Sequence, residues 1–209
     1  MVNKKNNSTN LEKNKKDKDT KLSEKKVLFQ NKFLNEIIPY IVIVIAVIII
    51  RSYIVTPVIV RGDSMDYTLK DGQILFLSKI SYRLHDIKRY DIIVINEEKD
   101  LIIKRVIGLP GDKVEYIDNK LYINNHKVKD DYGIGNTSDF TLEDICEIND
   151  DRCNGKIPSG MYLALGDNRE VSADSRVKGL FSKNKILGKA TLRIWPITKI
   201  GLVKWLLIF

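Results

Sequence analysis

The sequence predicts a mainly β protein, an antiparallel sheet or a partly closed barrel, carried on one N-terminal transmembrane helix. Three observations lead to this fold class. The first 32 residues are basic and have few apolar side chains, the next 21 contain an unbroken apolar run, and the remainder alternates short apolar runs with turn residues. A length of 209 residues with 44% hydrophobic composition suits one compact domain with appendages.

The N-terminal segment, residues 1–32, is predicted to be a disordered cytoplasmic tail. It holds ten lysines against four acidic residues and so supplies +6 of the formal net charge of +8. With so few apolar side chains, burial cannot offset the conformational entropy that folding would cost. The segment also lacks the aromatic or helix-forming interleaving that nucleic-acid binding usually requires, so we expect no nucleic-acid partner.

Residues 33–53 are predicted to be a transmembrane signal anchor. The unbroken run from Ile37 to Ile50 is 14 residues long, which is short for a span of about 20, but apolar residues on both sides extend it, including "SYIVTPVIV" after Arg51. Isoleucine and valine cover every face of the run, which favours a membrane span over a buried core helix. Most of the nearby positive charge precedes the run, so we expect membrane lipid as a partner and residues 54–209 outside the cytoplasm.

Residues 54–209 are predicted to form an extracytoplasmic β-rich domain. Short runs of Ile, Val, Leu and Tyr bounded by turn residues are typical of strands. The expected strands are 74–80, 91–96, 101–109, 113–117, 120–124 and 161–166. The dipeptides Asp118-Asn119 and Asn124-Asn125 predict consecutive hairpins over 113–128.

Residues 130–158 are expected to be an irregular insertion that contains both cysteines, Cys146 and Cys153. Outside the membrane these two cysteines would close a short disulfide loop; in a reducing habitat they would remain free thiols. A zinc site is not expected, because no third and fourth ligands accompany them. At the C-terminus, "IGLVKWLLIF" is either a last core strand or a segment that enters the membrane interface.

Both histidines, His85 and His126, are expected at the surface, so no Ser-His-Asp triad is predicted. Lys104 offers a different base, because strand alternation places it on one face with Ile102 and Val106. Arg105 takes the opposite face, and one of the two basic residues must therefore point toward a buried side. A desolvated lysine loses proton affinity and can deprotonate a serine such as Ser64; a lysine that snorkels to the surface cannot.

Four stretches of the sequence bear on whether Ser64 and Lys104 act together. In order they are "GDSMDYTL" at 62–69, "YDIIVI" at 90–95, "KRVIGLPGD" at 104–112 and "GDNREVSADSR" at 166–176. Following a membrane anchor, they resemble bacterial type I signal peptidases, the Ser-Lys enzymes that remove signal peptides from exported proteins. The resemblance runs through nearly all of residues 36–200 and implies a β-rich catalytic domain on the outer face of the membrane.

The resemblance also implies roles for individual residues. Ser64 matches the nucleophile and Lys104 the general base, and Ser172 matches a second serine expected to hydrogen-bond and orient the lysine amine. Asp174 and Arg176 match an ion pair that supports the site. The implied substrate-binding wall consists of Val58, Val60, Met65, Leu69 and Ile103. It favours alanine-like residues at the positions one and three before the cleavage site of a preprotein.

Two positions depart from the pattern of the family. Tyr67 stands where a proline is usual, which alters turn rigidity but removes no reacting group. Gly62 stands where some members carry a serine that assists the oxyanion hole, so the backbone N–H of Ser64 is expected to be the main donor to the oxyanion.

The implied reaction is hydrolysis of a peptide bond by a serine endopeptidase. It needs no cofactor, metal or nucleotide, and the sequence has no glycine-rich phosphate-binding loop. Self-cleaving repressors share the Ser-Lys pair but require a DNA-binding module, which residues 1–53 do not provide. An inactive signal-peptidase-like binding protein would be expected to lack the serine or the lysine, and a basic, lipid-attached structural protein would not carry four motifs in this order.

Overall fold

A computed structural model describes residues 35–97, 100–148 and 153–203 of the chain. The chain divides into two compact units at the boundary between Ile50 and Arg51. In the first unit, residues 35–49 are α-helical. None of the helices in the described part of the chain combines the length and the hydropathy that a bilayer crossing needs. The predicted basic tail and the start of the predicted anchor lie outside the described residues.

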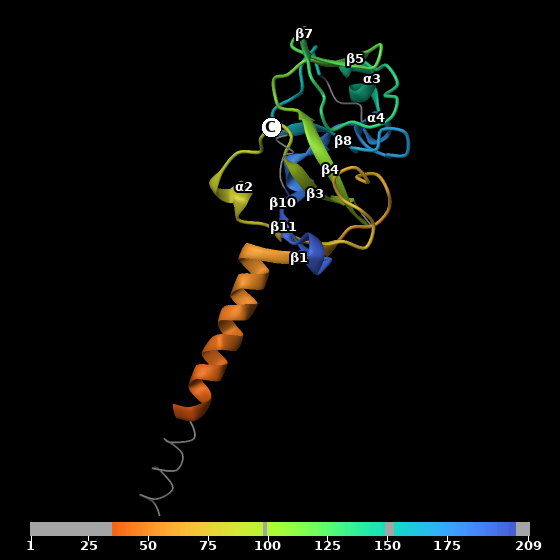
Figure 1. Cartoon of the computed structure of the whole chain (residues 1–209). Helices are drawn as coiled ribbons and strands as arrows, with labels where there is room; N and C mark the ends of the chain where they lie inside the picture. Colours follow the sequence, from red (N-terminus) through yellow and green to blue (C-terminus); the bar gives the residue numbers. More distant parts are fainter. Residues whose placement is uncertain (1–34, 98–99, 149–152, 204–209) are drawn as a thin grey trace, which may run out of the picture. The chain divides into compact units, whose positions relative to one another are not determined.

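Within the described residues of the second unit, eight strands form one antiparallel sheet (Figure 1). The order across it is β1, β2, β10, β3, β4, β8 and β9, with β11 paired to the end of β10. The strands are β1 (Val55–Ile59), β2 (Ile74–Ser78), β3 (Ile92–Glu97), β4 (Asp100–Gly108), β8 (Met161–Leu165), β9 (Phe181–Ser182), β10 (Ile186–Trp195) and β11 (Gly201–Leu202). The path does not close between β1 and β9, so the antiparallel sheet is confirmed and a closed barrel is not formed.

A smaller sheet follows β4 in the chain. It consists of two hairpins built from β5 (Val114–Ile117), β6 (Lys120–Ile123) and β7 (His126–Val128). The two predicted turns carry positive φ at all four residues, between 50° and 65° at Asp118, Asn119, Asn124 and Asn125. Such angles are those of a type I′ turn, which asparagine and aspartate tolerate. The predicted hairpins are therefore confirmed.

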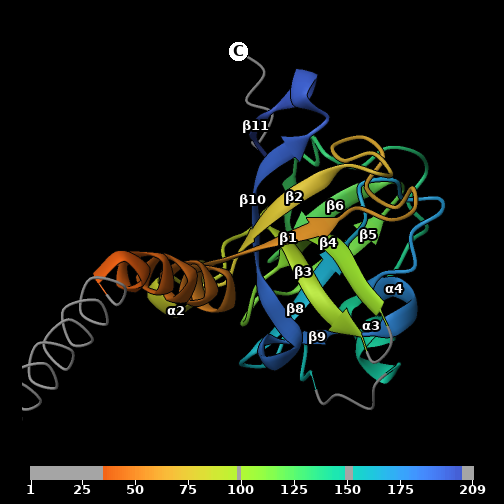
Figure 2. The same ribbon diagram turned by 90° about the horizontal axis from the view of Figure 1, so that it is seen from below.

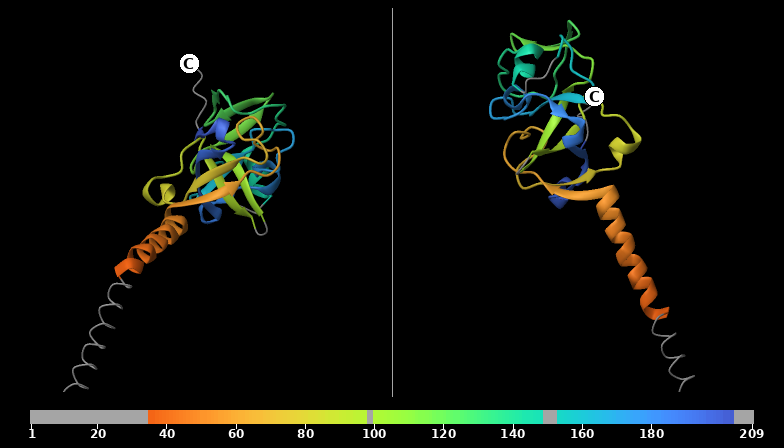
Figure 3. Two further views of the ribbon diagram at one scale, coloured as in Figure 1. Left: turned by 60° about the horizontal axis from the view of Figure 1, so that its bottom comes forward. Right: turned by 180° about the vertical axis from the view of Figure 1, so that it is seen from behind.

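The second unit also contains three short α-helices: α2 (Ser81–Leu84), α3 (Leu142–Glu147) and α4 (Ser175–Lys178). Single turns of other helix types complete the described elements: η1 (Ile50–Ile54), η2 (Lys183–Lys185) and η3 (Ile197–Lys199). The predicted irregular insertion thus contains one helix, α3, whose Thr141 and Asp144 form a reciprocal capping box. Figure 3 shows α3 (teal) at the same end of the unit as the small sheet (green). The two pack together, since apolar side chains of β5, β6 and α3 share one buried cluster.

The two cysteines of the insertion are paired. Cys146 and Cys153 form a disulfide with a Cα–Cα distance of 6.1 Å, and both are buried in the cluster under the small sheet. The alternative of two free thiols is therefore excluded for the structure. Both histidines are exposed, as expected.

Three strands, β1, β9 and β10, were not anticipated from the sequence. The apolar residues after Arg51 were expected to lengthen the anchor, but Val55–Ile59 form β1 and pair with β2 along its whole length. The longest strand, β10 (blue in Figure 2), lies between β2 and β3. At the C-terminus, β11 pairs with β10, whereas Trp205 and Phe209 lie outside the described residues.

Candidate active site

Ser64 lies in a tight reversal of the chain between β1 and β2 and is partly buried. Local hydrogen bonds hold this turn, including Asp66 N–H to Asp63 O at 3.0 Å and Leu69 N–H to Met65 O at 2.7 Å. Gly62 enters the turn with a φ of +76°, a conformation that glycine adopts without steric cost. The stretch is therefore a turn that presents a serine.

The backbone of Ser64 is fixed by the distant segment 166–172. Asn168 N–H donates a hydrogen bond of 3.0 Å to the Ser64 carbonyl. Gly166 packs so closely that a Cβ added there would lie 2.5 Å from the Ser64 carbonyl oxygen and 2.2 Å from Ser172 Oγ. Among the described residues, none accepts a hydrogen bond from the Ser64 N–H. This N–H is therefore free to donate to a developing oxyanion.

Lys104 lies in the middle of β4, opposite Ile93 of β3, and is only 3% exposed. Burial lowers the pKa of its ammonium from 10.5 to about 8, because few waters can solvate the charge. The carboxylate of Asp174 acts in the opposite direction, and Lys178 and Arg176 lower the pKa further. The amine is therefore neutral in an appreciable fraction of molecules near neutral pH.

The structure brings Ser64 and Lys104 together. Both line one small cavity of about 60 Å³, together with Val60, Met65 and Ile103. The two other residues of the predicted substrate wall, Val58 and Leu69, do not line this cavity. They are buried in the apolar cluster that also contains Val60, Met65 and Ile103.

Arg105 is buried as well, although strand alternation required only one of the two adjacent basic residues to point toward a buried side. Its side chain is 1% exposed, on the opposite face of β4 from Lys104. It makes a bidentate ion pair with Asp167 at 2.8 and 2.7 Å and donates to Thr68 Oγ1 at 2.9 Å. Both faces of β4 are covered at this point, and the second cation is tolerated because it is fully paired.

This arginine joins three of the four motifs. It belongs to the lysine strand, Thr68 belongs to the serine turn, and Asp167 belongs to the turn at 166–169. Thr68 also donates directly to Asp167 at 2.5 Å. Asp167 was not among the site residues expected from the sequence, so this connection was not predicted. The available signal was that Arg105 alternates with Ile103 and Ile107, two aliphatic residues that need a buried face.

Ser172 is buried, and its hydroxyl has no hydrogen-bond partner among the described residues. The expected hydrogen bond to Lys104 is therefore not formed. The hydroxyl instead packs against Gly166, beside the Ser64 carbonyl. Ser172 accordingly lies near the backbone of Ser64 but forms no hydrogen bond with the Lys104 amine.

Asp174 and Arg176 form the ion pair that the resemblance implies, with Arg176 donating from Nε and Nη2 at 2.9 Å each. Asp174 also accepts from Gly166 N–H at 2.9 Å and caps the N-terminus of α4. Burial by itself would raise the pKa of this carboxyl, but the hydrogen bonds and the charge of Arg176 outweigh burial and lower it. The ionised carboxylate thus holds the Gly166 backbone in place.

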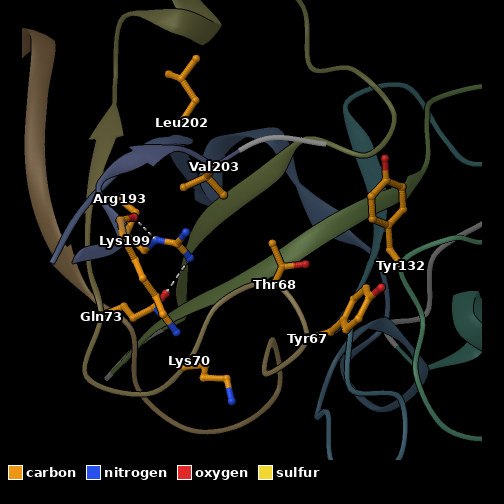
Figure 4. A pocket seen from close by; sticks show the side chains of 9 residues that line it. All are labelled: Tyr67, Thr68, Lys70, Gln73, Tyr132, Arg193, Lys199, Leu202 and Val203. Carbon is orange, nitrogen blue, oxygen red and sulfur yellow. Dashed lines mark hydrogen bonds between the residues drawn. The ribbon is translucent and has the colours of Figure 1, made fainter. Parts of the chain in front are cut away.

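A larger cavity of about 410 Å³ lies on another side of the serine turn. Figure 4 shows the residues that line it, which include Lys70, Arg193 and Lys199. Arg193 donates hydrogen bonds to the side chain of Gln73 and to the carbonyl of Lys199. We call it the basic cavity, defined by Lys70, Arg193 and Lys199. Neither Ser64 nor Lys104 lines it, since both line the smaller cavity.

Comparisons with known proteins identify a family for the chain. Residues 33–195 match the family described as "Signal peptidase, peptidase S26". The chain is 38% identical to signal peptidase IB of Staphylococcus aureus over 180 residues, which is 81% of this chain and 93% of the relative. It is likewise 38% identical to signal peptidase I of Bacillus caldolyticus over 168 residues, 76% of this chain and 89% of the relative.

A solved structure of a signal peptidase I from Enterococcus faecalis is also similar, with 36% identity, a TM-score of 0.43, and coverage of 51% of this chain and 98% of that one. The family assignment rests on the match to residues 33–195 and on the two relatives. The chain therefore belongs to the signal peptidase family, peptidase S26, among the bacterial type I signal peptidases, and is a serine-type peptide hydrolase.

Proposed function

We propose that the chain is a membrane-anchored endopeptidase that cleaves signal peptides from exported preproteins with Ser64 as nucleophile and Lys104 as general base. One observation carries the assignment: a serine on a rigid turn and a lysine with a depressed pKa line the same small cavity. The two histidines are exposed on other segments, so Lys104 is the base that the site offers to the serine.

In the proposed reaction, neutral Lys104 removes the proton of the Ser64 hydroxyl as the oxygen attacks the scissile carbonyl carbon. The Ser64 N–H donates to the resulting oxyanion. Lys104 then passes the proton to the leaving amine, which leaves an acyl ester on Ser64. Lys104 next takes a proton from water as the water oxygen attacks the ester carbonyl. The ester C–O bond then breaks, the Ser64 oxygen takes this proton back from Lys104, and the acyl group leaves as the new carboxyl terminus. Ser172 and the pair Asp174–Arg176 hold the surrounding backbone in position.

The open edge of β4 gives the signal peptide a place to bind. On its β8 side, β4 is paired only from Arg105 onward, so Asp100–Lys104 leave backbone groups available beside the reactive lysine. An extended peptide can pair there by strand addition. Val60, Met65 and Ile103 leave little space in the cavity, which favours alanine-like residues at the positions one and three before the cleavage site.

The proposed location is the cell membrane, with residues 33–53 as a single-pass anchor, the tail at 1–32 in the cytoplasm and residues 54–209 outside. The isoleucine and valine side chains from Ile38 to Ile50 are each at least half exposed and occur on every face of this helical segment, as on a helix surrounded by lipid. The lysine-rich tail supports this orientation. The disulfide supports an oxidising compartment for the second unit.

Substitution of the reactive pair tests the assignment. We expect Ser64→Ala and Lys104→Ala each to lower kcat/KM for a purified preprotein by at least about 1,000-fold, because each change removes an essential group. The measurement is cleavage in detergent with the full chain, accompanied by circular dichroism to verify the fold. Ser159→Ala, at an exposed serine outside the described cavities, is the matched control and should cleave normally. Processing by either folded dyad variant at the rate of the parent chain would remove the assignment.

The pH dependence is a separate test. Only the neutral amine acts as a base, and the pKa of Lys104 is lowered to about 8. We therefore expect kcat/KM to rise about tenfold from pH 7 to pH 9 and then to level off, because the neutral fraction grows over that interval. The measurement is initial-rate cleavage of one peptide across this range. A rate that is flat from pH 6 to pH 10 would exclude Lys104 as the base.

A further inference from the structure

A cavity of about 600 Å³ lies between the segment leading into α3 and the loop leading into α4. Three carboxylates, those of Asp139, Asp144 and Glu170, are part of its lining. We call it the acidic cavity, defined by these three residues. It is separate from the small cavity that holds Ser64 and Lys104, and none of the predicted substrate-wall residues lines it.

The charge of the acidic cavity is negative because its two arginines are already neutralised. Arg169 pairs with Asp130, and Arg176 pairs with Asp174. The three carboxylates of the cavity form no ion pair with any residue in the described part of the chain. Asp144 accepts hydrogen bonds within the α3 cap, and Glu170 accepts one from Asn136 N–H. Their charges remain available to a cationic group.

A metal ion does not suit this arrangement. Among the described residues, no three carboxylate, histidine or cysteine side chains converge closely enough to hold one. The carboxylates are instead distributed along the cavity wall. Such a wall fits an extended ligand with a positive side chain better than a point ion.

Ser172 connects the acidic cavity to the nucleophile. It lines the cavity, is about nine-tenths buried, and its hydroxyl has no hydrogen-bond partner among the described residues. On its other side, it packs on Gly166, which in turn contacts the Ser64 carbonyl. Ser172 and Gly166 therefore connect the lining of the acidic cavity to the backbone of Ser64, and Ser64 itself lines the small cavity.

We infer that the acidic cavity binds the part of the preprotein that follows the scissile bond, and that it favours lysine or arginine there. The inference rests on the proposed function, because a chain attacked at Ser64 must continue past the nucleophile on both sides. Residues before the bond occupy the small cavity beside the β4 edge. Residues after it pass Ser172 into the acidic cavity, where Glu170 and Asp139 attract a cationic side chain and repel an anionic one.

The test uses the full chain in detergent and a set of peptides that share one signal sequence. Each peptide carries lysine, glutamine or glutamate at the second, third or fourth residue after the cleavage site. We expect kcat/KM to be about fivefold higher for lysine than for glutamate at one or more of these positions, a size that suits partly exposed carboxylates. The preference should fall as salt rises, since screening weakens such interactions.

One double variant and one control variant test whether the preference arises in the acidic cavity. Asp139→Asn with Glu170→Gln removes two charges and keeps the acceptor for Asn136 N–H, while Asp144 is left in place because it caps α3. We expect the lysine-to-glutamate ratio of kcat/KM to approach one in this double variant. Asp118→Asn, at the exposed tip of the β5–β6 hairpin, removes a carboxylate elsewhere and should leave the ratio as in the parent chain.

The outcomes separate this inference from the proposed function. If the parent chain does not cleave the glutamine peptides, the proposed function fails. If it cleaves all peptides equally, or keeps its preference in the double variant, the acidic cavity has no such role. A preference for glutamate would overturn the inference, because it would indicate that the residues after the scissile bond bind at the basic cavity (Lys70, Arg193 and Lys199).

Discussion

Lys104 lowers the stability of the folded protein, in addition to its role in the proposed reaction. In the unfolded chain its amine is protonated up to about pH 10.5, whereas burial lowers the pKa in the folded protein to about 8. The unfolded state thus binds more protons between these values, and stability rises with pH across that window. Below about pH 8 the full penalty is present, because folding must bury a charged ammonium.

Replacement of the lysine by a neutral side chain of similar length should remove this penalty. We expect Lys104→Met to raise the free energy of unfolding by about 1–3 kcal/mol at pH 6 and by much less at pH 10. Denaturant unfolding at the two pH values measures the difference. Lys127→Met, at an exposed lysine, should change stability little at either pH. An equal loss of stability at both pH values for Lys104→Met would contradict the account.

Strand alternation identified Lys104 as unusual but could not determine which face of β4 is buried. The structure shows that both faces are covered at this point, so Arg105 is buried as well. The partners that make this tolerable, Thr68 and Asp167, lie 37 and 62 residues away in the chain. Local sequence patterns report the period of a strand, whereas the partners of a buried charge depend on the tertiary arrangement.

At the scale of elements, Gly166 controls how closely the turn at 166–169 approaches the serine turn. A Cβ at this position would lie 2.5 Å from the Ser64 carbonyl oxygen, a backbone atom that cannot rotate away. We expect Gly166→Ala to lower kcat/KM at least about 100-fold and stability by about 1–3 kcal/mol, because the two turns must separate.

Gly201→Ala provides the control, since a Cβ there has no neighbour within 4 Å. Activity and thermal midpoint of both variants can be measured side by side. Normal cleavage by Gly166→Ala would mean that the contact between the two turns does not position Ser64.

The strands that the sequence analysis did not identify have identifiable causes. β1 follows the apolar helix with only Arg51 and Ser52 interrupting the run, so composition does not mark where one ends and the other begins. In β10, the register shifts against both β2 and β3. Such irregularities break the alternation that would reveal a strand. The hairpins at 113–128 were predictable because Asp118-Asn119 and Asn124-Asn125 encode their turns locally.

At the scale of the whole molecule, the disulfide between Cys146 and Cys153 constrains the insertion that carries α3. Its sequence separation of 7 corresponds to a stabilisation of about 2–3 kcal/mol by the loop-entropy relation. We expect a reductant to lower the thermal midpoint of the oxidised protein. The double variant Cys146→Ser with Cys153→Ser should have a lower thermal midpoint, and the reductant should not change it. An equal change of the midpoint in both proteins would contradict a stabilising role for the disulfide.

The Ser64 carbonyl accepts its hydrogen bond from Asn168, and Asp174 and Arg176 stabilise the segment that supplies it. Translation produces the serine turn more than a hundred residues before these partners. A growing polypeptide that has not yet reached residue 176 consequently has its serine and its lysine but lacks the segment that orients them. Synthesis from the N-terminus therefore delays hydrolytic competence until the last quarter of the molecule has emerged and folded.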